Sequence, residues 1–335
     1  MATRWAICGA GKIANDFCMC LNALPSSEHQ IVAVGASSKE KAEKFAAQFG
    51  NPRSYGSYKE LAELDDVDVV YVSVFHPLHV ELCLMYINAG KSVLCEKPMA
   101  LSLDGCRKVL QAAKDKGVLF VEGYWTRFFP VSQLIREQIS SGAIGDVKLV
   151  QANFSIPIAE VPRLKQLDLG GGALMDIGLY PFQAANMVFK GKPQSIKSEL
   201  TLNEQGVDKS GAVILNYGSG RMASLTFSAE TQGGDNCLFI RGTKGTIQVP
   251  NPFWCSDQVI LPSGEVKKFP LPHVDNPEKF NFFNCEGLTY EAQAVRECLL
   301  KGLKESPVVP HEDSETNMYI LQQVLDQHGI KYLAP

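Results

Sequence analysis

The chain has 335 residues, which is more than one ordinary hydrophobic core holds and therefore predicts two domains. Its formal net charge is -4 and charges of both signs are mixed along it, so the basic surface that nucleic acid requires is not expected. No apolar run approaches the roughly 18 residues of a membrane span, and the first apolar segment begins almost at Met1, which leaves no room for a signal peptide. These features predict a cytoplasmic protein that binds neither nucleic acid nor membranes.

The cysteines agree with a reducing compartment. The chain has 10 of them, and most lie inside apolar patterns, as Cys83, Cys95 and Cys298 do, so we expect free thiols. Cys18 and Cys20 are separated by one residue instead of the two that are typical of zinc and redox motifs, and no second pair follows at ligand spacing. The sequence therefore predicts no metal site.

The first predicted element is a strand over residues 5–7, and the pattern Gly-x-Gly-x-x-Ala follows it directly at residues 9–14. Gly9 permits a tight turn from strand to helix, and Gly11 lets the backbone approach a pyrophosphate. Ala14 lets the helix pack closely on the sheet. The pattern predicts a dinucleotide site at the helix N-terminus, where free N–H groups favour negative charge.

The context strengthens this interpretation. A helical stretch over residues 15–24 and an apolar run over residues 31–34 complete a βαβ unit of the expected length. At the turn itself, the residues expected to contact the cofactor are Gly9, Gly11, Lys12 and Ile13.

The end of the second predicted strand indicates which dinucleotide binds. NAD enzymes of this fold place an acidic residue there, on the ribose 2′-hydroxyl. This chain has Ser37, Ser38 and Lys39 instead, which supply two hydroxyl donors and a cation for a 2′-phosphate. Although Glu40 follows one residue later, the segment favours NADP.

The rest of the first third alternates apolar strands with helices, as a parallel sheet requires. Strands are expected over residues 69–74, 92–95 and 118–121, and helices over residues 77–89 and 102–114. The fold class predicted for residues 1–122 is a doubly wound α/β Rossmann domain.

After residue 122 period-two strands follow one another without helices between them, which predicts an α+β domain with a mostly antiparallel sheet over residues 123–335. The strands are expected at residues 148–153, 195–202, 212–216, 222–228, 237–241 and 246–249, and helices at 131–141, 290–300 and 314–327.

Two groups of residues could carry chemistry. The predicted strand 92–95 leads into Glu96, Lys97 and Pro98, and the carboxyl ends of parallel strands are where such sheets bind ligands, so Lys97 is expected to face the cofactor. The alternative is a surface lysine beside a turn. Asp176 and Tyr180 follow three glycines and lie at i and i+4 of a helix, which directs both to one ligand. Spacing alone favours the alternative, a helix cap and a core tyrosine.

Three segments together resemble the glucose–fructose oxidoreductase and inositol dehydrogenase family. They are the glycine pattern at 9–14, the Glu-Lys-Pro signature that ends residues 89–98, and Gly-Gly-Ala-Leu-x-Asp-x-Gly-x-Tyr at residues 171–180. Their order and separation match over essentially the whole chain. The Glu-Lys-Pro signature is specific, whereas the glycine pattern alone is not.

The resemblance implies roles for the residues that match. Lys97 becomes the catalytic lysine, Asp176 a carboxylate that orients the substrate, and Tyr180 the proton acceptor. A phenol titrates near pH ~10, so it needs a neighbouring cation such as Lys97 to act as a base near neutrality. Of His76 and His79, where the family has an asparagine and a histidine, one is expected to touch the nicotinamide ribose or to order the loop. The alternative for His76 is an exposed loop residue.

Tyr180 departs from the family, which usually has histidine there. With this tyrosine and the segments at residues 125–130 and 251–255, the chain resembles those members of the family that use NADP to oxidise trans-dihydrodiols of aromatic hydrocarbons to catechols, and D-xylose to its lactone. Aromatic residues are ordinarily part of the core, but this resemblance implies that Trp125, Phe154 and Trp254 line a pocket for a flat ring.

The resemblance also implies a homodimer formed through the open sheet of the second domain. Two alternatives stay open. One is a sugar or inositol dehydrogenase without diol activity, and the other is a dinucleotide-sensing regulatory protein without turnover. The retention of Lys97 argues against the second.

Overall fold

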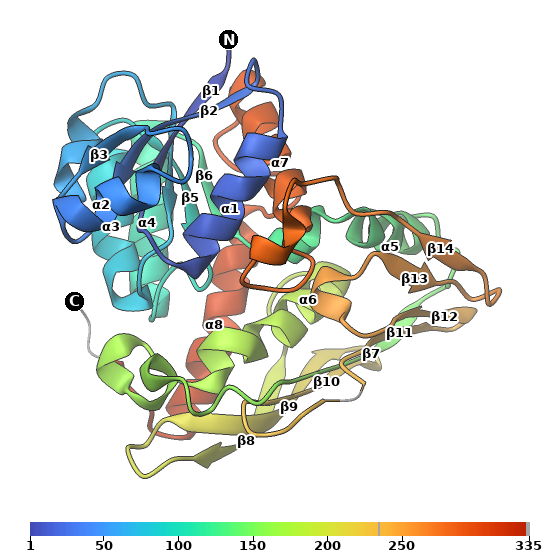
Figure 1. Ribbon diagram of the computed structural model, residues 1–335. Coiled ribbons are helices and arrows are strands. Elements are labelled where there is room, and N and C mark those ends of the chain that lie inside the picture. Colours follow the sequence, from blue (N-terminus) through green and yellow to red (C-terminus); the bar gives the residue numbers. More distant parts are fainter. Residues whose placement is uncertain (234, 333–335) are drawn as a thin grey trace.

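The computed structural model describes residues 1–233 and 235–332, and it contains two sheets with helices packed against them (Figure 1). The first sheet is entirely parallel, with the strand order β3-β2-β1-β4-β5-β6, which confirms the predicted Rossmann domain. Its strands and connecting helices are β1 (Thr3–Cys8), α1 (Lys12–Ala23), β2 (His29–Gly35), α2 (Lys39–Ala46), β3 (Arg53–Tyr55), β4 (Val69–Val72), α3 (His79–Asn88), β5 (Ser92–Glu96), α4 (Leu103–Lys116) and β6 (Phe120–Gly123).

The first sheet is buried on both faces, as its continuous apolar strands lead one to expect. Every residue of β4 is buried, and Trp5 of β1 is fully buried. Phe17 of α1 stacks on Tyr71 of β4 with their ring centroids 4.0 Å apart, so the first helix packs directly on the middle of the sheet. The strand order reverses between β1 and β4, and open α/β sheets bind ligands at the carboxyl ends of the strands beside such a switch point.

The second sheet has the strand order β14-β13-β12-β11-β7-β10-β9-β8, and only the pair β7 and β10 is parallel. The predicted α+β domain with a mostly antiparallel sheet is confirmed, whereas its predicted start after residue 122 stays a prediction. The strands and α-helices of this part are α5 (Pro130–Ser140), β7 (Val147–Ser155), α6 (Leu179–Phe189), β8 (Ser195–Leu202), β9 (Asp208–Gly218), β10 (Arg221–Ser228), β11 (Leu238–Gly242), β12 (Gly245–Val249), β13 (Gln258–Ile260), β14 (Val266–Lys268), α7 (Leu288–Leu300) and α8 (His311–Gln327).

The second sheet is covered on one face only. Helix α6 packs against β7 and β10, and α8 packs against β8, while Figure 1 shows no helix on the opposite face of the drawn chain. Burial alternates accordingly: Val213 and Leu215 of β9 are fully buried, but Ile214 between them is 38% exposed and Met222 of β10 is 42% exposed. Apolar side chains therefore stand on the uncovered face.

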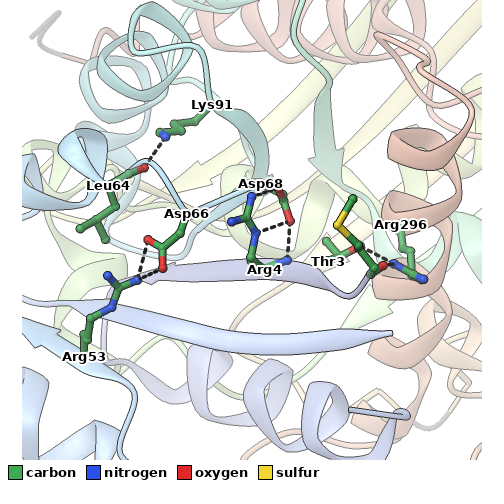
Figure 2. Close-up of polar contacts among 9 residues, drawn as sticks. Thr3, Arg4, Arg53, Leu64, Asp66, Asp68, Lys91 and Arg296 are labelled. Atoms are coloured by element: carbon green, nitrogen blue, oxygen red, sulfur yellow. Dashed lines mark hydrogen bonds and ion pairs between the residues drawn. The ribbon is translucent and has the colours of Figure 1, made fainter. Parts of the chain in front are cut away.

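The carboxyl-terminal segment returns to the Rossmann domain. Helix α7 packs against α1, and α8 packs against α4. Asp16 of α1 is fully buried and accepts hydrogen bonds from the backbone N–H groups of Asn281 at 3.0 Å and Phe282 at 3.1 Å. Arg296 of α7 donates to the Thr3 hydroxyl of β1 at 2.9 Å (Figure 2). The second half of the chain thus covers part of the first.

Three further features bear on the predictions. Within residues 1–233 and 235–332, no helix is both long and apolar enough to cross a bilayer. In the same ranges no three His, Cys, Asp or Glu side chains gather in the way that metal ligands do. All of the cysteines are free thiols, and all but Cys237 are buried.

Two ion pairs join the amino ends of the parallel strands (Figure 2). Asp68, just before β4, accepts hydrogen bonds from Arg4 of β1: from its backbone N–H at 2.8 Å, from Nε at 3.1 Å and from Nη2 at 2.7 Å. Arg53 of β3 donates to both carboxylate oxygens of Asp66 at 2.7 Å. Burial opposes the charge of Asp68, but the bonds from Arg4 outweigh it and lower the pKa of this carboxyl. These pairs stabilise the end of the sheet that lies opposite to the ligand-binding end.

We expect Asp68→Asn to lower the free energy of unfolding at pH 7 by about 1 kcal/mol, because the pair is partly exposed and water screens its charge. A carboxyl with a lowered pKa stabilises the fold only while it is ionised, so the difference from the wild type shrinks as the pH falls below about 4. Urea unfolding at several pH values measures it. The control is Asp65→Asn, at an exposed neighbour. A difference that persisted unchanged at low pH would contradict the electrostatic explanation.

Candidate active site

The turn after β1 has the shape that a dinucleotide phosphate requires. Gly9 has a φ of +119°, which other residues rarely adopt, and a Cβ there would lie 2.8 Å from the carbonyl oxygen of Ser73. Gly11 is extended at the start of α1, and a Cβ added to it would meet nothing within 4 Å. Open space therefore adjoins the helix N-terminus, where free N–H groups favour anions. This arrangement fits a dinucleotide pyrophosphate, with the predicted contacts Lys12 and Ile13 in the first helical turn.

The end of β2 differs in one respect from the prediction. Ser38 caps α2 by accepting a hydrogen bond from the backbone N–H of Lys41. The ammonium of Lys39, the residue predicted to supply a cation for the 2′-phosphate, donates to the backbone carbonyl of Ser54 on β3. The Lys41 ammonium donates to the Ser37 hydroxyl at 3.1 Å. The cation beside Ser37 is therefore Lys41, which lies one helical turn further along and was not among the predicted residues.

Lys97 follows the last residue of β5 and reaches across to the second domain. Its ammonium donates to the backbone carbonyl of Asp176 at 2.8 Å and lies 3.6 Å from a carboxylate oxygen of the same residue. It also lies 5.0 Å from the centre of the Tyr180 ring. Behind it, Glu96 accepts a hydrogen bond from the Tyr71 hydroxyl at 2.6 Å, which anchors the loop. The three predicted catalytic side chains therefore lie together.

Asp176 is held between two cations. Nη2 of Arg163 lies 3.0 Å from each carboxylate oxygen. The ammonium of Lys97, which follows β5 of the Rossmann domain, lies 3.6 Å from one of them. Burial opposes ionisation, but Lys97 and Arg163 outweigh it and lower the pKa of Asp176. Sequence reasoning missed Arg163 because no motif marks it. The loop that carries it folds back onto the glycine segment, in part through backbone hydrogen bonds such as that from Gly172 N–H to the Leu164 carbonyl at 3.1 Å.

The helix that carries Asp176 and Tyr180 begins with a widened, π-helical turn, Leu174–Gly178, and continues as α6. Its first N–H groups are capped from outside the helix, because the Asp208 carboxylate of β9 accepts from Leu174 N–H at 2.6 Å. A Cβ on Gly172 would collide with this carboxylate, which explains the glycine there. Burial raises the pKa of Asp208 to about 7, although its backbone hydrogen bonds oppose that shift.

Aromatic side chains from three separate segments surround Tyr180. Phe154 of β7 meets the Tyr180 ring edge-on, with centroids 5.4 Å apart, and stacks on Trp254 at 3.9 Å. Trp125 belongs to a short 3-10 helix, Trp125–Phe128, and its indole N–H donates to the Tyr180 hydroxyl oxygen at 3.0 Å. Burial raises the pKa of Tyr180 well above its usual value. All three predicted pocket residues thus lie at this site.

The two histidines order the loop after β4. His79 is fully buried, and its ring nitrogens lie 2.8 Å from the Pro98 carbonyl and 3.0 Å from the Val74 carbonyl. His76 is partly buried, so it is not the exposed loop residue of the alternative interpretation, and its Nδ1 lies 3.2 Å from the Gly170 carbonyl. Burial, together with the neighbouring His79, lowers the pKa of His76 to about 3, so that its ring is neutral at pH 7.

Full-length relatives carry a consistent description. A trans-1,2-dihydrobenzene-1,2-diol dehydrogenase from Xenopus laevis is 46% identical over 333 residues, which cover 99% of this chain and all (100%) of that protein. A protein of the same description from Bos taurus is 43% identical, over 99% of this chain and 98% of its own.

Solved structures with the same fold are more distant in sequence. KijD10, a 3-ketoreductase from Actinomadura kijaniata in complex with NADP and TDP-benzene, superposes with a TM-score of 0.81 at 24% identity, over 97% of this chain and 98% of its own. An aldose-aldose oxidoreductase from Caulobacter crescentus complexed with glycerol gives 0.84 at 23% identity, over 98% of each chain. At this level of identity the likeness establishes the fold alone.

Two family models match the two halves of the chain. The model described as an oxidoreductase family with an NAD-binding Rossmann fold matches residues 3–124, and the model of the GFO/IDH/MocA C-terminal domain matches residues 132–248. The resemblance stated from the sequence motifs is confirmed. The chain belongs to the GFO/IDH/MocA family of oxidoreductases.

Proposed function

We propose that this oxidoreductase oxidises trans-dihydrodiols of aromatic hydrocarbons to catechols, and D-xylose to D-xylonolactone, with NADP. The observation that carries the proposal is the cluster of Lys97, Asp176 and Tyr180 beside the stacked rings of Phe154 and Trp254. The relatives described as dihydrodiol dehydrogenases, which are 41% to 46% identical over 99% of the chain, support the diol as substrate. When bound, NADP accepts a hydride from the carbinol carbon.

The side chains of the site transfer the proton, stabilise charge and orient the substrate. Tyr180 accepts the proton of the reacting hydroxyl, and the Lys97 ammonium stabilises the negative charge that develops on that oxygen. Asp176, kept ionised by Lys97 and Arg163, accepts a hydrogen bond from the second hydroxyl and so orients the diol.

The aromatic wall suits a flat substrate. Trp254 is only partly buried, and its stacking on Phe154 fixes its ring plane. An aromatic hydrocarbon diol stacks on such a face while its hydroxyl groups reach Tyr180 and Asp176. D-xylose has no ring system to stack, so it depends on the polar residues alone.

The preference for NADP rests on Ser37 and Lys41 at the end of β2. Their hydroxyl and ammonium groups are bonded to each other at 3.1 Å and suit a 2′-phosphate, for which an acidic residue would be repulsive. Lys39 contributes less, because its ammonium is engaged by Ser54 and lies 3.9 Å from Glu43.

The uncovered face of the second sheet supports a homodimer. Ile214 and Met222 stand on it, and a second copy of the sheet would remove them from water. The cytoplasmic location expected from the sequence stays a prediction.

Separate assays with each substrate test the proposal. A trans-dihydrodiol of benzene and D-xylose are each supplied with NADP and with NAD, and the absorbance of the reduced nicotinamide is followed. Turnover of both substrates supports the proposal. Turnover of D-xylose alone identifies a sugar dehydrogenase without diol activity, and no turnover of either leaves a dinucleotide sensor.

We expect Lys97→Met to lower kcat by about 10²–10⁴-fold, because both proton transfer and charge stabilisation depend on its ammonium. The same substitution weakens cofactor binding, which fluorescence titration measures. Lys108→Met, which removes an exposed lysine of α4, is the control. If Lys97→Met kept more than a tenth of the wild-type kcat, Lys97 would be a structural residue.

Lys41→Ala should raise KM for NADP roughly 10–100-fold and leave KM for NAD almost unchanged, because a charge-assisted hydrogen bond contributes about 1.5–3 kcal/mol. Lys39→Ala is the matched control and should have a much smaller effect. Comparable kcat/KM values for NAD and NADP in the wild-type protein would overturn the assignment of NADP.

A further inference from the structure

The indole of Trp125 is directed at the hydroxyl oxygen of Tyr180. Its side chain is only 7% exposed, and its Nε1 lies 3.0 Å from that oxygen. An indole N–H donates and never accepts, so the Tyr180 oxygen must be the acceptor in this bond. The proton of the Tyr180 hydroxyl is therefore directed away from Trp125.

The surroundings of Trp125 hold this donor in place. Its ring packs edge-on against Phe129, with centroids 5.4 Å apart. The next residue, Thr126, donates to the Trp254 carbonyl and accepts from the Ser132 hydroxyl at 2.7 Å through its own carbonyl. The short helix is thus fixed on both sides, and the indole N–H is pre-oriented toward Tyr180.

The other charged and titratable groups around Tyr180 do not replace this bond. Lys97 lies over the face of the ring, and its ammonium is bonded to the carbonyl of Asp176 rather than to the phenol oxygen. Burial, Glu96, Asp176 and Cys255 all raise the pKa of Tyr180, whereas the hydrogen bond from Trp125 lowers it.

We propose that Trp125 is a positioning residue that makes Tyr180 a competent base, because its indole N–H stabilises the phenolate that accepts the substrate proton. This inference rests on the proposed function. In the step concerned, the O–H bond of the substrate breaks and a new O–H bond forms on Tyr180, the carbinol hydride reduces the dinucleotide, and Tyr180 later returns its proton to water. Trp125 then acts on the reaction through Tyr180 and does not itself contact the substrate. The substrate stacks on Trp254 and Phe154.

The first test compares Trp125→Phe with Trp254→Phe, each of which keeps an aromatic ring and removes an indole. For a base, kcat/KM rises with pH through its pKa. Removing a hydrogen-bond donor to the Tyr180 phenolate raises the pKa of Tyr180. In Trp125→Phe the pH at which kcat/KM rises should therefore increase by about one to two pH units, equally for the diol and for D-xylose. Trp254→Phe should raise KM for the diol and leave the position of the rise unchanged.

A second test needs no turnover. The chain has only 3 tryptophans, so its indole N–H groups give a simple ¹⁵N–¹H spectrum, which the two Trp→Phe variants assign. In Tyr180→Phe the Trp125 signal should shift and its N–H should exchange faster with solvent, whereas the Trp5 signal should stay in place.

The outcomes separate the possibilities. A pH profile that keeps its position in Trp125→Phe, with a higher KM for the diol alone, means that Trp125 stacks on the substrate. If Trp125→Phe loses the same fraction of kcat/KM at every pH and also melts at a lower temperature, Trp125 has a structural role. An unchanged Trp125 signal in Tyr180→Phe also overturns the inference. If the wild type turns over neither substrate, the proposed function fails, and the spectra still decide whether the bond exists.

Discussion

The contact between Lys97 and Asp176 joins the two domains at the candidate active site. Lys97 follows a strand of the parallel sheet, and Asp176 lies in the widened turn that leads into α6 over the second sheet. The 2.8 Å bond from the ammonium to the Asp176 carbonyl sets how far apart these elements stand. Arg163 and the ring of Tyr180 are placed relative to the same pair, so the geometry of the whole site depends on this one contact.

Two cations converge on the carboxylate of Asp176. His76 is neutral because burial lowers its pKa to about 3, so the cations that face Asp176 are the ammonium of Lys97 and the guanidinium of Arg163. A cation fixed in place before the reaction begins suits a step in which an oxygen becomes negative. The same two cations explain why Asp176 stays ionised despite its burial.

The sequence predicted what local rules control. Apolar runs, glycines in tight turns and the position of Lys97 at a strand end follow from short-range sterics and patterning, so both sheets and the place of Lys97 after β5 were predicted. Side-chain direction was not predictable. Nothing in the pattern says that Lys41 rather than Lys39 reaches Ser37, or that the indole of Trp125 bonds to Tyr180, because these directions depend on packing between distant segments.

The return of α7 to the first strand has a consequence for how the chain acquires its fold. The residues joined by the bond between Arg296 and Thr3 are 293 positions apart in the sequence. Asp16 of α1 likewise accepts its hydrogen bond from a distant residue, Asn281. Contacts between such distant positions close large loops and slow folding. The first strand leaves the ribosome early, but the groups that complete its packing and that of α1 are synthesised near the end. An amino-terminal fragment would therefore carry the dinucleotide motif with one face of its helix uncovered, so cofactor binding should mature only when synthesis of the chain is nearly complete.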